Sequence, residues 1–308
     1  MRPDPRPDRR PDPRTEPRTV SLDLDAVRLS ALAWGPDHRT GDGPLAVLLH
    51  GFPDSAYTWR HLGPALAGDG YRVVAPFTRG YGPSAVAADG SGHVAALMDD
   101  AVAVHAHCSG GDDAVLVGHD WGAITSNALA SHLQNPFGRI VSLAVPPFST
   151  VRPRIRALPR QLRNSWYIAF NQLPILPERT ADRLVRRLWA DWSPGYDASD
   201  DLPAFLAAIA EPAHRRAVIG YYRALARPLP RPPERYRRWA GAEQRPPLRP
   251  LLYLHGADDG CMDRRLVEGV GDRLPAGSAV HLVPGAGHFL QLEQPDLVNT
   301  LIREYLTA

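Results

Sequence analysis

Two short segments near the start of the chain alternate apolar and polar residues. They cover residues 20–24 and 27–33, and the apolar positions of the second segment are out of step with those of the first. Alternation with a period of two is typical of strands that bury one face. The two segments therefore predict an antiparallel hairpin at the edge of a sheet.

Continuous apolar runs, separated by stretches with helical spacing, dominate the next part of the sequence. Runs without alternation are typical of strands buried on both faces of a parallel sheet. The stretches at 93–108 and 121–133 have the spacing of helices. This succession favours an α/β fold in which helices cover both faces of a mostly parallel sheet. The predicted strands are LAVLLH (45–50), YRVVAPF (71–77), AVLVGH (114–119) and IVSLAV (140–145).

The strand pattern stops after Pro147 and returns near the end of the chain. Residues 148–247 contain no strand-like run and show helical periodicity in pieces such as 180–190 and 213–226. The sequence therefore predicts a core of residues 19–147 and 248–308, split by an α-helical cap at 148–247 that is inserted before the last two strands. The elements expected after the cap are LLYLHG (251–256), AVHLVP (279–284) and a helix at 294–306.

Composition fits a folded domain with one unusual end. Of the 308 residues, 44% are hydrophobic and 22% are charged, which is ordinary globular usage. Residues 1–18 instead repeat Pro, Arg and Asp and carry the whole net charge of +2. Such a segment has too little apolar surface to fold, so we expect a disordered tail. The near-neutral remainder argues against a nucleic-acid binder.

Cysteine use and hydropathy indicate the compartment. Cys108 and Cys261 are far apart in sequence, which excludes a disulfide framework and favours a reducing environment. The chain has neither the apolar stretch of a secretory signal nor an apolar run of roughly 18 residues. We expect a cytoplasmic protein without membrane insertion.

The strongest chemical signal is the segment Gly118-His119-Asp120-Trp121-Gly122-Ala123, which directly follows a predicted buried strand and opens a helix. Small residues at 118, 122 and 123 suit a sharp strand-to-helix turn, because the backbones there pass too close for larger side chains. The turn lifts its central residue off the carboxyl edge of the sheet with a positive φ, which Asp tolerates better than most residues. Asp120 is therefore the candidate nucleophile.

Such a nucleophile calls for a base and for an acid that orients the base. His288, in a Gly-rich loop after the last strand, is the candidate base. The loop after 251–256 offers Asp258 and Asp259, whereas the alternative strand end at 145–147 has no carboxylate. Spacing favours Asp259, with Asp258 as the alternative. The order nucleophile, acid, histidine is that of α/β-hydrolases.

The segment His50-Gly51-Phe52-Pro53 follows the first buried strand. Its loop is placed to supply the Phe52 amide, which would pair with the Trp121 amide to bind a developing oxyanion. Pro53 is a candidate for a cis peptide bond.

Together HGFP, GHDWGA, the late Asp259 and GAGH resemble the epoxide hydrolase branch of the α/β-hydrolase fold, over residues 20 to 308. The resemblance implies two cap tyrosines above the nucleophile. Tyr167, a few residues before a Gln near a Pro, matches the first, and Tyr222, which precedes an Arg, matches the second. Tyr221 is the alternative to Tyr222.

The residue set predicts a covalent mechanism on a small hydrophobic epoxide. A carboxylate is ionised at neutral pH and can attack an sp³ carbon to form an alkyl-enzyme ester. Tyrosines can protonate the alkoxide, and His288 with Asp259 would activate the water that releases a vicinal diol. Two alternatives stay open. The first is a haloalkane dehalogenase: these enzymes share Asp-Trp at the turn but often have Asn where this chain has Phe52. The second is a ligand-binding protein that has kept the pocket but lost turnover.

No cofactor or metal is predicted. His105, His107 and Cys108 resemble a fragment of a metal site without a third ligand at suitable spacing, and no phosphate loop or dinucleotide fingerprint is present. We interpret the arginines of the early cap as a solvated face rather than an anion site. These arginines are Arg152, Arg154, Arg156, Arg160 and Arg163.

The sequence does not fix the oligomeric state, so a monomer and a homodimer both stay open.

Overall fold

The computed structural model describes residues 16–152, 155–227 and 229–308 and contains an eight-stranded sheet. Its strands lie in the order β1-β2-β4-β3-β5-β6-β7-β8. All neighbours from β4 to β8 run parallel, while β1 pairs with β2 and β2 with β4 in the antiparallel sense. The strands are β1 (Arg18–Asp23), β2 (Arg28–Trp34), β3 (Leu45–Leu49), β4 (Arg72–Pro76), β5 (Val115–His119), β6 (Arg139–Leu143), β7 (Leu252–Gly256) and β8 (Ala279–Val283).

The predicted edge hairpin is present, but the boundary of the tail is wrong at its inner end. Residues 1–15 lie outside the described part of the chain. Arg18, assigned to the tail from its sequence, already belongs to β1 and pairs with Ala33 of β2. Its guanidinium donates a hydrogen bond of 2.9 Å to the Gly35 carbonyl. This arginine is ordered because the neighbouring strand offers it backbone partners.

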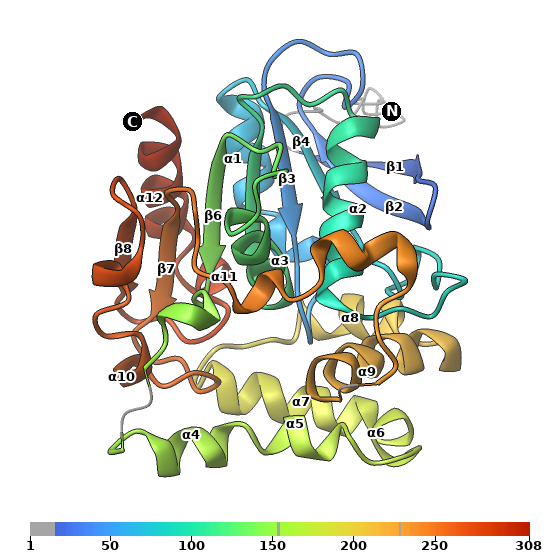
Figure 1. Ribbon diagram of the computed structural model, residues 1–308, viewed down its shortest axis with the longest axis vertical. Helices are drawn as coiled ribbons and strands as arrows, with labels where there is room; N and C mark the ends of the chain where they lie inside the picture. The colour runs from blue at the N-terminus through green and yellow to red at the C-terminus, as the bar shows by residue number, and fades with distance from the viewer. Residues whose placement is uncertain (1–15, 153–154, 228) are drawn as a thin grey trace, which may run out of the picture.

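Helices cover both faces of the sheet (Figure 1). On one face, α2 (Val94–His107) packs against α3 (Trp121–Ala130); on the other, α1 (Leu62–Gly68) packs against α12 (Pro295–Thr307). The predicted helices at 93–108, 121–133 and 294–306 are therefore confirmed within a few residues. Shorter elements complete the core: η1 (Ala56–Trp59), α10 (Arg264–Val267), η5 (Gly271–Arg273) and α11 (Leu290–Glu293).

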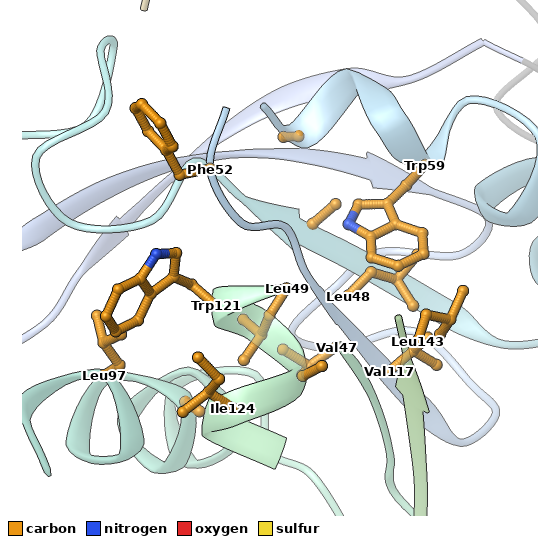
Figure 2. Close-up of a cluster of buried hydrophobic side chains, with 14 of the residues drawn as sticks. Val47, Leu48, Leu49, Phe52, Trp59, Leu97, Val117, Trp121, Ile124 and Leu143 are labelled. Atoms are coloured by element: carbon orange, nitrogen blue, oxygen red, sulfur yellow. The ribbon is translucent and has the colours of Figure 1, made fainter. Parts of the chain in front are cut away.

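The centre of the sheet is the centre of the hydrophobic core. All five residues of β3 and all five of β5 are buried, as expected for strands covered on both faces. Figure 2 shows Val47 and Leu49 of β3 beside Ile124 of α3, with Phe52 and Trp121 projecting on the same side. These two central strands end where the candidate nucleophile and its amide donors begin, so a rigid base supports the site.

The helical insertion predicted before the last two strands lies between β6 and β7, where it covers the carboxyl ends of the strands (Figure 1). The last part of the insertion packs on the core helices beside the sheet: η3 (Glu234–Trp239) contacts α2, and η4 (Ala242–Gln244) contacts α3. Trp239 Nε1 donates to Asp99 (3.0 Å), and Ser131 Oγ donates to the Ala242 carbonyl (2.7 Å). The insertion comprises η2 (Phe148–Thr150), α4 (Leu158–Asn164), α5 (Trp166–Phe170), α6 (Leu176–Arg179), α7 (Ala181–Trp192), α8 (Leu202–Ala208), α9 (Pro212–Ala226), η3 (Glu234–Trp239) and η4 (Ala242–Gln244).

Candidate active site

Asp120 stands alone between β5 and α3, at the sharp turn that the sequence predicts. Its φ of 52° and ψ of −110° lie outside the regions that most residues adopt. The flanking glycines are required by contact. A Cβ on Gly118 would lie 2.1 Å from the Gly122 carbonyl oxygen, and one on Gly122 would lie 2.0 Å from that of Leu49. The turn thus presents the Asp120 carboxylate above the sheet.

The backbone of the HGFP loop meets one oxygen of this carboxylate. Phe52 N donates to Asp120 Oδ1 at 2.8 Å, and the Phe52–Pro53 peptide bond is cis. Gly51 makes this approach feasible, because a Cβ there would lie 2.3 Å from Oδ1 and 2.6 Å from the Trp121 amide nitrogen. Both amides named from the sequence therefore lie beside the Asp120 carboxyl group.

His288 lies between two carboxylates. Its Nδ1 is 3.0 Å from Asp259 Oδ2, and its Nε2 is 3.6 Å from Asp120 Oδ2. The other oxygen of Asp259 accepts hydrogen bonds from the Cys261 and Met262 amides. Asp258 is exposed and its amide bonds to the Ala286 carbonyl. Of the two candidate acids, the structure brings only Asp259 to the histidine.

The charges of Asp120, His288 and Asp259 determine where protons are held in this group. Burial opposes ionisation of His288, but Asp259 and Asp120 together raise its pKa to about 10. Burial likewise disfavours the Asp259 anion, and His288 more than offsets this, so the pKa of Asp259 is lowered. The two flanking carboxylates therefore favour the protonated form of His288 in the free protein. Loss of the Asp120 charge would remove part of what holds that proton.

The two cap tyrosines named from the resemblance lie over the turn. Tyr167 of α5 and Tyr222 of α9 meet edge to face, with ring centroids 5.5 Å apart. Tyr222 also packs against Phe52 (5.4 Å) and Trp121 (5.2 Å). The alternative, Tyr221, instead donates its hydroxyl to the Arg79 carbonyl at 2.7 Å. Tyr222, whose neighbours include both amide-donor residues, is the tyrosine that faces the site.

Both cap hydroxyls stay protonated, mainly because they are buried and to a smaller extent because each has a polar group nearby. The pKa of Tyr222 is raised well above its usual value by burial and by the Asp120 charge. The pKa of Tyr167 is raised by burial and by Cys261, whose Sγ lies 3.4 Å from the Tyr167 hydroxyl. Both tyrosines can therefore act as hydrogen-bond or proton donors.

Cys261 is a site residue that sequence reasoning missed. It lies two positions after Asp259 and is buried, and burial together with the nearby carboxylates raises its pKa well above the usual value of a thiol. Its donor atom lies within 4.8 Å of those of Asp259 and His288, which is a possible metal-ligand geometry. In the structure as found, the latter two side chains bond to each other. The only available signal was the proximity of Cys261 to Asp259 in sequence.

A tryptophan at the end of α7 joins the cap to both loops of the acid–base pair. The Trp192 carbonyl accepts hydrogen bonds of 3.0 Å from the amides of Gly260 and His288. Its ring lies 4.7 Å from the His288 ring and 4.9 Å from that of Tyr167. The junction between cap and core is thus part of the site.

Behind the site, a buried acid lacks a full set of partners. Asp54 Oδ1 accepts the Ser55 amide at 2.7 Å, whereas Oδ2 has no hydrogen-bond partner in the described part of the chain and is 3.9 Å from His119 Nδ1. His119 donates through Nε2 to the His288 carbonyl at 3.0 Å. Burial raises the pKa of Asp54 to about 7. This acid is therefore partly neutral at physiological pH.

The sequence matches a protein-family model over most of its length. The model for the alpha/beta hydrolase fold matches residues 44–295, most of the sequence. The chain belongs to the α/β-hydrolase fold family. The candidate nucleophile turn, acid and histidine of this α/β-hydrolase lie within the matched segment.

Its relatives include proteins named epoxide hydrolases. Epoxide hydrolase A of Mycobacterium tuberculosis is 30% identical, over 93% of this α/β-hydrolase and 96% of the relative. Epoxide hydrolase 3 of Mus musculus is 28% identical, over 86% and 71% of the two chains. The AB hydrolase superfamily protein YfhM of Bacillus subtilis is 30% identical, over 86% and 91%.

Solved structures agree on the fold. Epoxide Hydrolase A from Mycobacterium thermoresistibile matches with a TM-score of 0.72 at 25% identity, covering 95% of this α/β-hydrolase and 98% of that chain. Epoxide hydrolase VrEH1 from Vigna radiata gives 0.74 at 22% identity, covering 96% and 99%. Within the described residues, none of the helices is long and apolar enough to cross a bilayer.

Proposed function

We propose that this α/β-hydrolase is an epoxide hydrolase that uses Asp120 as its nucleophile. The supporting observation is the combination of a buried carboxylate at the strand-to-helix turn with two protonated tyrosine hydroxyls above it. Epoxide opening creates an alkoxide, a poor leaving group unless a proton donor meets it. Halide departure needs no such donor, so the two tyrosines favour an epoxide over a haloalkane. The aromatic walls favour a small hydrophobic substrate.

In the first step, Asp120 Oδ2 attacks an epoxide carbon. The Phe52 amide already binds Oδ1, which leaves Oδ2 as the attacking oxygen. The carbon–oxygen bond of the ring breaks, and the resulting alkoxide takes a proton from Tyr222 or Tyr167. Asp120 becomes a neutral ester, so part of the electrostatic support for the His288 proton disappears. The His288 proton then passes to the tyrosinate, which restores the tyrosine and leaves His288 as a neutral base.

In the second step, water hydrolyses the ester. His288, oriented by Asp259, takes a proton from water, and the hydroxide adds to Cγ of Asp120. Negative charge develops on the oxygen beside the Phe52 and Trp121 amides, where one such donor contributes on the order of 3 kcal/mol. The ester bond to the substrate then breaks, the hydroxyl proton passes to the departing alkoxide, and a vicinal diol leaves.

A single turnover in ¹⁸O-water tests this route. With enzyme in excess over styrene oxide, the label is expected in the Asp120 side chain, and the first diol carries oxygen from the protein. Label in that first diol would mean direct attack of water and would contradict the nucleophile assignment. A bromoalkane provides the parallel assay. Halide release without diol formation would support the dehalogenase alternative, and binding without turnover would support a ligand-binding protein.

Variants separate the two steps. Asp120→Ala is expected to abolish turnover, and His288→Gln is expected to alkylate but not hydrolyse, leaving a covalent adduct visible by mass spectrometry. Asp259→Asn should lower ester hydrolysis strongly, whereas Asp258→Asn, an exposed neighbour, should behave like the unmodified protein. Equal losses in the two Asn variants would contradict the choice of acid.

A further inference from the structure

The outer edge of the cap carries a row of exposed apolar side chains. α4, α5 and α6 lie along the edge of the molecule farthest from the sheet (Figure 1). Ile155 is 89% exposed and Leu162 is 66% exposed, and Leu158 and Trp166 are exposed as well. Single exposed apolar residues are common on soluble proteins, but a contiguous row marks an interaction surface.

The row runs along α4 and across the turn at Ser165 into α5. Leu158 and Leu162, four residues apart on α4, share one face of that helix. Ile155 precedes α4, Trp166 begins α5, and the exposed Leu173 and Leu176 follow α5. In a globular protein such a face normally turns toward the core. Here the buried residues of the same stretch, Ala157 and Tyr167, occupy other positions. The apolar face is therefore directed outward.

Arginines flank this row. Arg156, Arg160 and Arg163 are exposed, and residues 155–177 contain no acidic residue. Arg160 also lies 3.5 Å from the buried Asp263, so part of its charge is balanced. An apolar row bordered by arginines is the pattern of a helix that lies in a bilayer interface, with cationic heads at the level of the phosphates.

We propose that the α4–α6 edge docks on the surface of an anionic phospholipid bilayer. Charge decides between this partner and a second copy of the chain. A two-fold interface would place the same patch against itself and bring the arginines of one copy against those of the other. A bilayer of negative surface potential complements them, and its acyl boundary accepts the leucines. The proposal concerns peripheral docking and does not rest on the chemistry proposed for Asp120.

Docking would bring the active site close to the bilayer. Trp166 of the apolar row and Tyr167 of the site are adjacent residues of α5. A hydrophobic compound dissolved in the bilayer would thus be near the cap tyrosines.

Co-sedimentation of the purified full-length protein with vesicles tests the proposal. Vesicles of phosphatidylcholine are compared with vesicles containing roughly one third phosphatidylglycerol, at about 50 mM and about 500 mM NaCl. Binding to the anionic vesicles is expected to be at least about tenfold tighter than to the neutral ones and to weaken in the high salt.

Three variants give the test its controls. Leu158→Ser/Leu162→Ser should reduce binding to anionic vesicles about tenfold or more, and Arg156→Gln/Arg163→Gln should reduce both the binding and its dependence on salt. Leu133→Ser removes an equally typical surface leucine, 84% exposed, that follows α3 at the end far from Asp120, and should change nothing. Thermal unfolding of each variant shows whether it is folded.

Three results would overturn the proposal: no binding to anionic vesicles, equal binding by the unmodified protein and a folded leucine variant, or a dimer that forms without lipid and dissociates in the leucine variant. The last result would assign the row to a second copy of the chain.

Discussion

The core and the cap hold their parts of the candidate site in different ways. In the core, backbone contacts fix Asp120 so closely that glycines 51, 118 and 122 cannot carry a Cβ without collision. In the cap, aromatic contacts surround Tyr167 and Tyr222, and the Tyr222 hydroxyl has no hydrogen-bond partner among the described residues. The candidate nucleophile is thus rigidly placed, whereas the Tyr222 hydroxyl above it is left for a ligand.

The largest effect should come from the rigid side of this comparison. Gly51→Ala would bring a methyl group to 2.3 Å from Asp120 Oδ1 and 2.6 Å from the Trp121 amide nitrogen. We expect epoxide turnover to fall about 100-fold or more, because one lost oxyanion donor costs on the order of 100-fold. Gly68→Ala is the control, since a Cβ there meets no atom of the described residues within 4 Å. Near-normal turnover in Gly51→Ala would mean that this loop is not rigid.

The adjacent cap tyrosines should give a smaller and divided effect. Tyr222→Phe removes the unpartnered hydroxyl, and we expect the rate of alkylation to fall roughly 10- to 100-fold with little change in stability. Tyr221→Phe removes the bond to the Arg79 carbonyl, and we expect a loss of about 1 kcal/mol in the free energy of unfolding with alkylation largely kept. Pre-steady-state adduct formation and urea unfolding measure the two. The reverse pattern would assign the donor to Tyr221.

The last prediction concerns stability alone and does not involve turnover. Because burial raises the pKa of Asp54 to about 7, its carboxyl binds a proton in the folded protein that the unfolded chain releases near 3.8. Its contribution to stability is full below 3.8 and is lost as the pH rises through 7. The free energy of unfolding of Asp54→Asn, relative to that of the unmodified protein, should therefore rise by roughly 1–4 kcal/mol between pH 4 and pH 7 and stay constant above pH 7. Urea unfolding across this range measures it, and a constant difference would show that Asp54 stays ionised.

The core was largely predictable because its sequence motifs reflect steric requirements of the backbone. A turn that needs small residues at 118 and 122, followed at fixed topological positions by an acid and a histidine, leaves few arrangements. The choice between Asp258 and Asp259 rested on spacing alone, and the conformation of the loop decides it. One residue earlier, the chain points its carboxylate to solvent.

The cap was harder to predict because helical periodicity does not say which face is buried. Tyr221 and Tyr222 are neighbours on α9, and both rings contact Trp121. Only the packed helix shows that the Tyr221 hydroxyl reaches the Arg79 carbonyl while the Tyr222 ring reaches Phe52. The same ambiguity hid the outward row on α4 and α5, where the arginines were recognised as a solvated face and the leucines between them were not. Cys261 belongs to no motif.

The Trp192 carbonyl has a consequence for exchanging caps between relatives. A graft cut at the chain boundaries of the insertion would import a foreign peptide group at the point where the amides of Gly260 and His288 converge. The donor protein would then set the spacing of the acid and base loops, although neither loop was transplanted. A chimera that retains the host's last turn of α7 would keep its own proton-transfer geometry while accepting a new substrate roof.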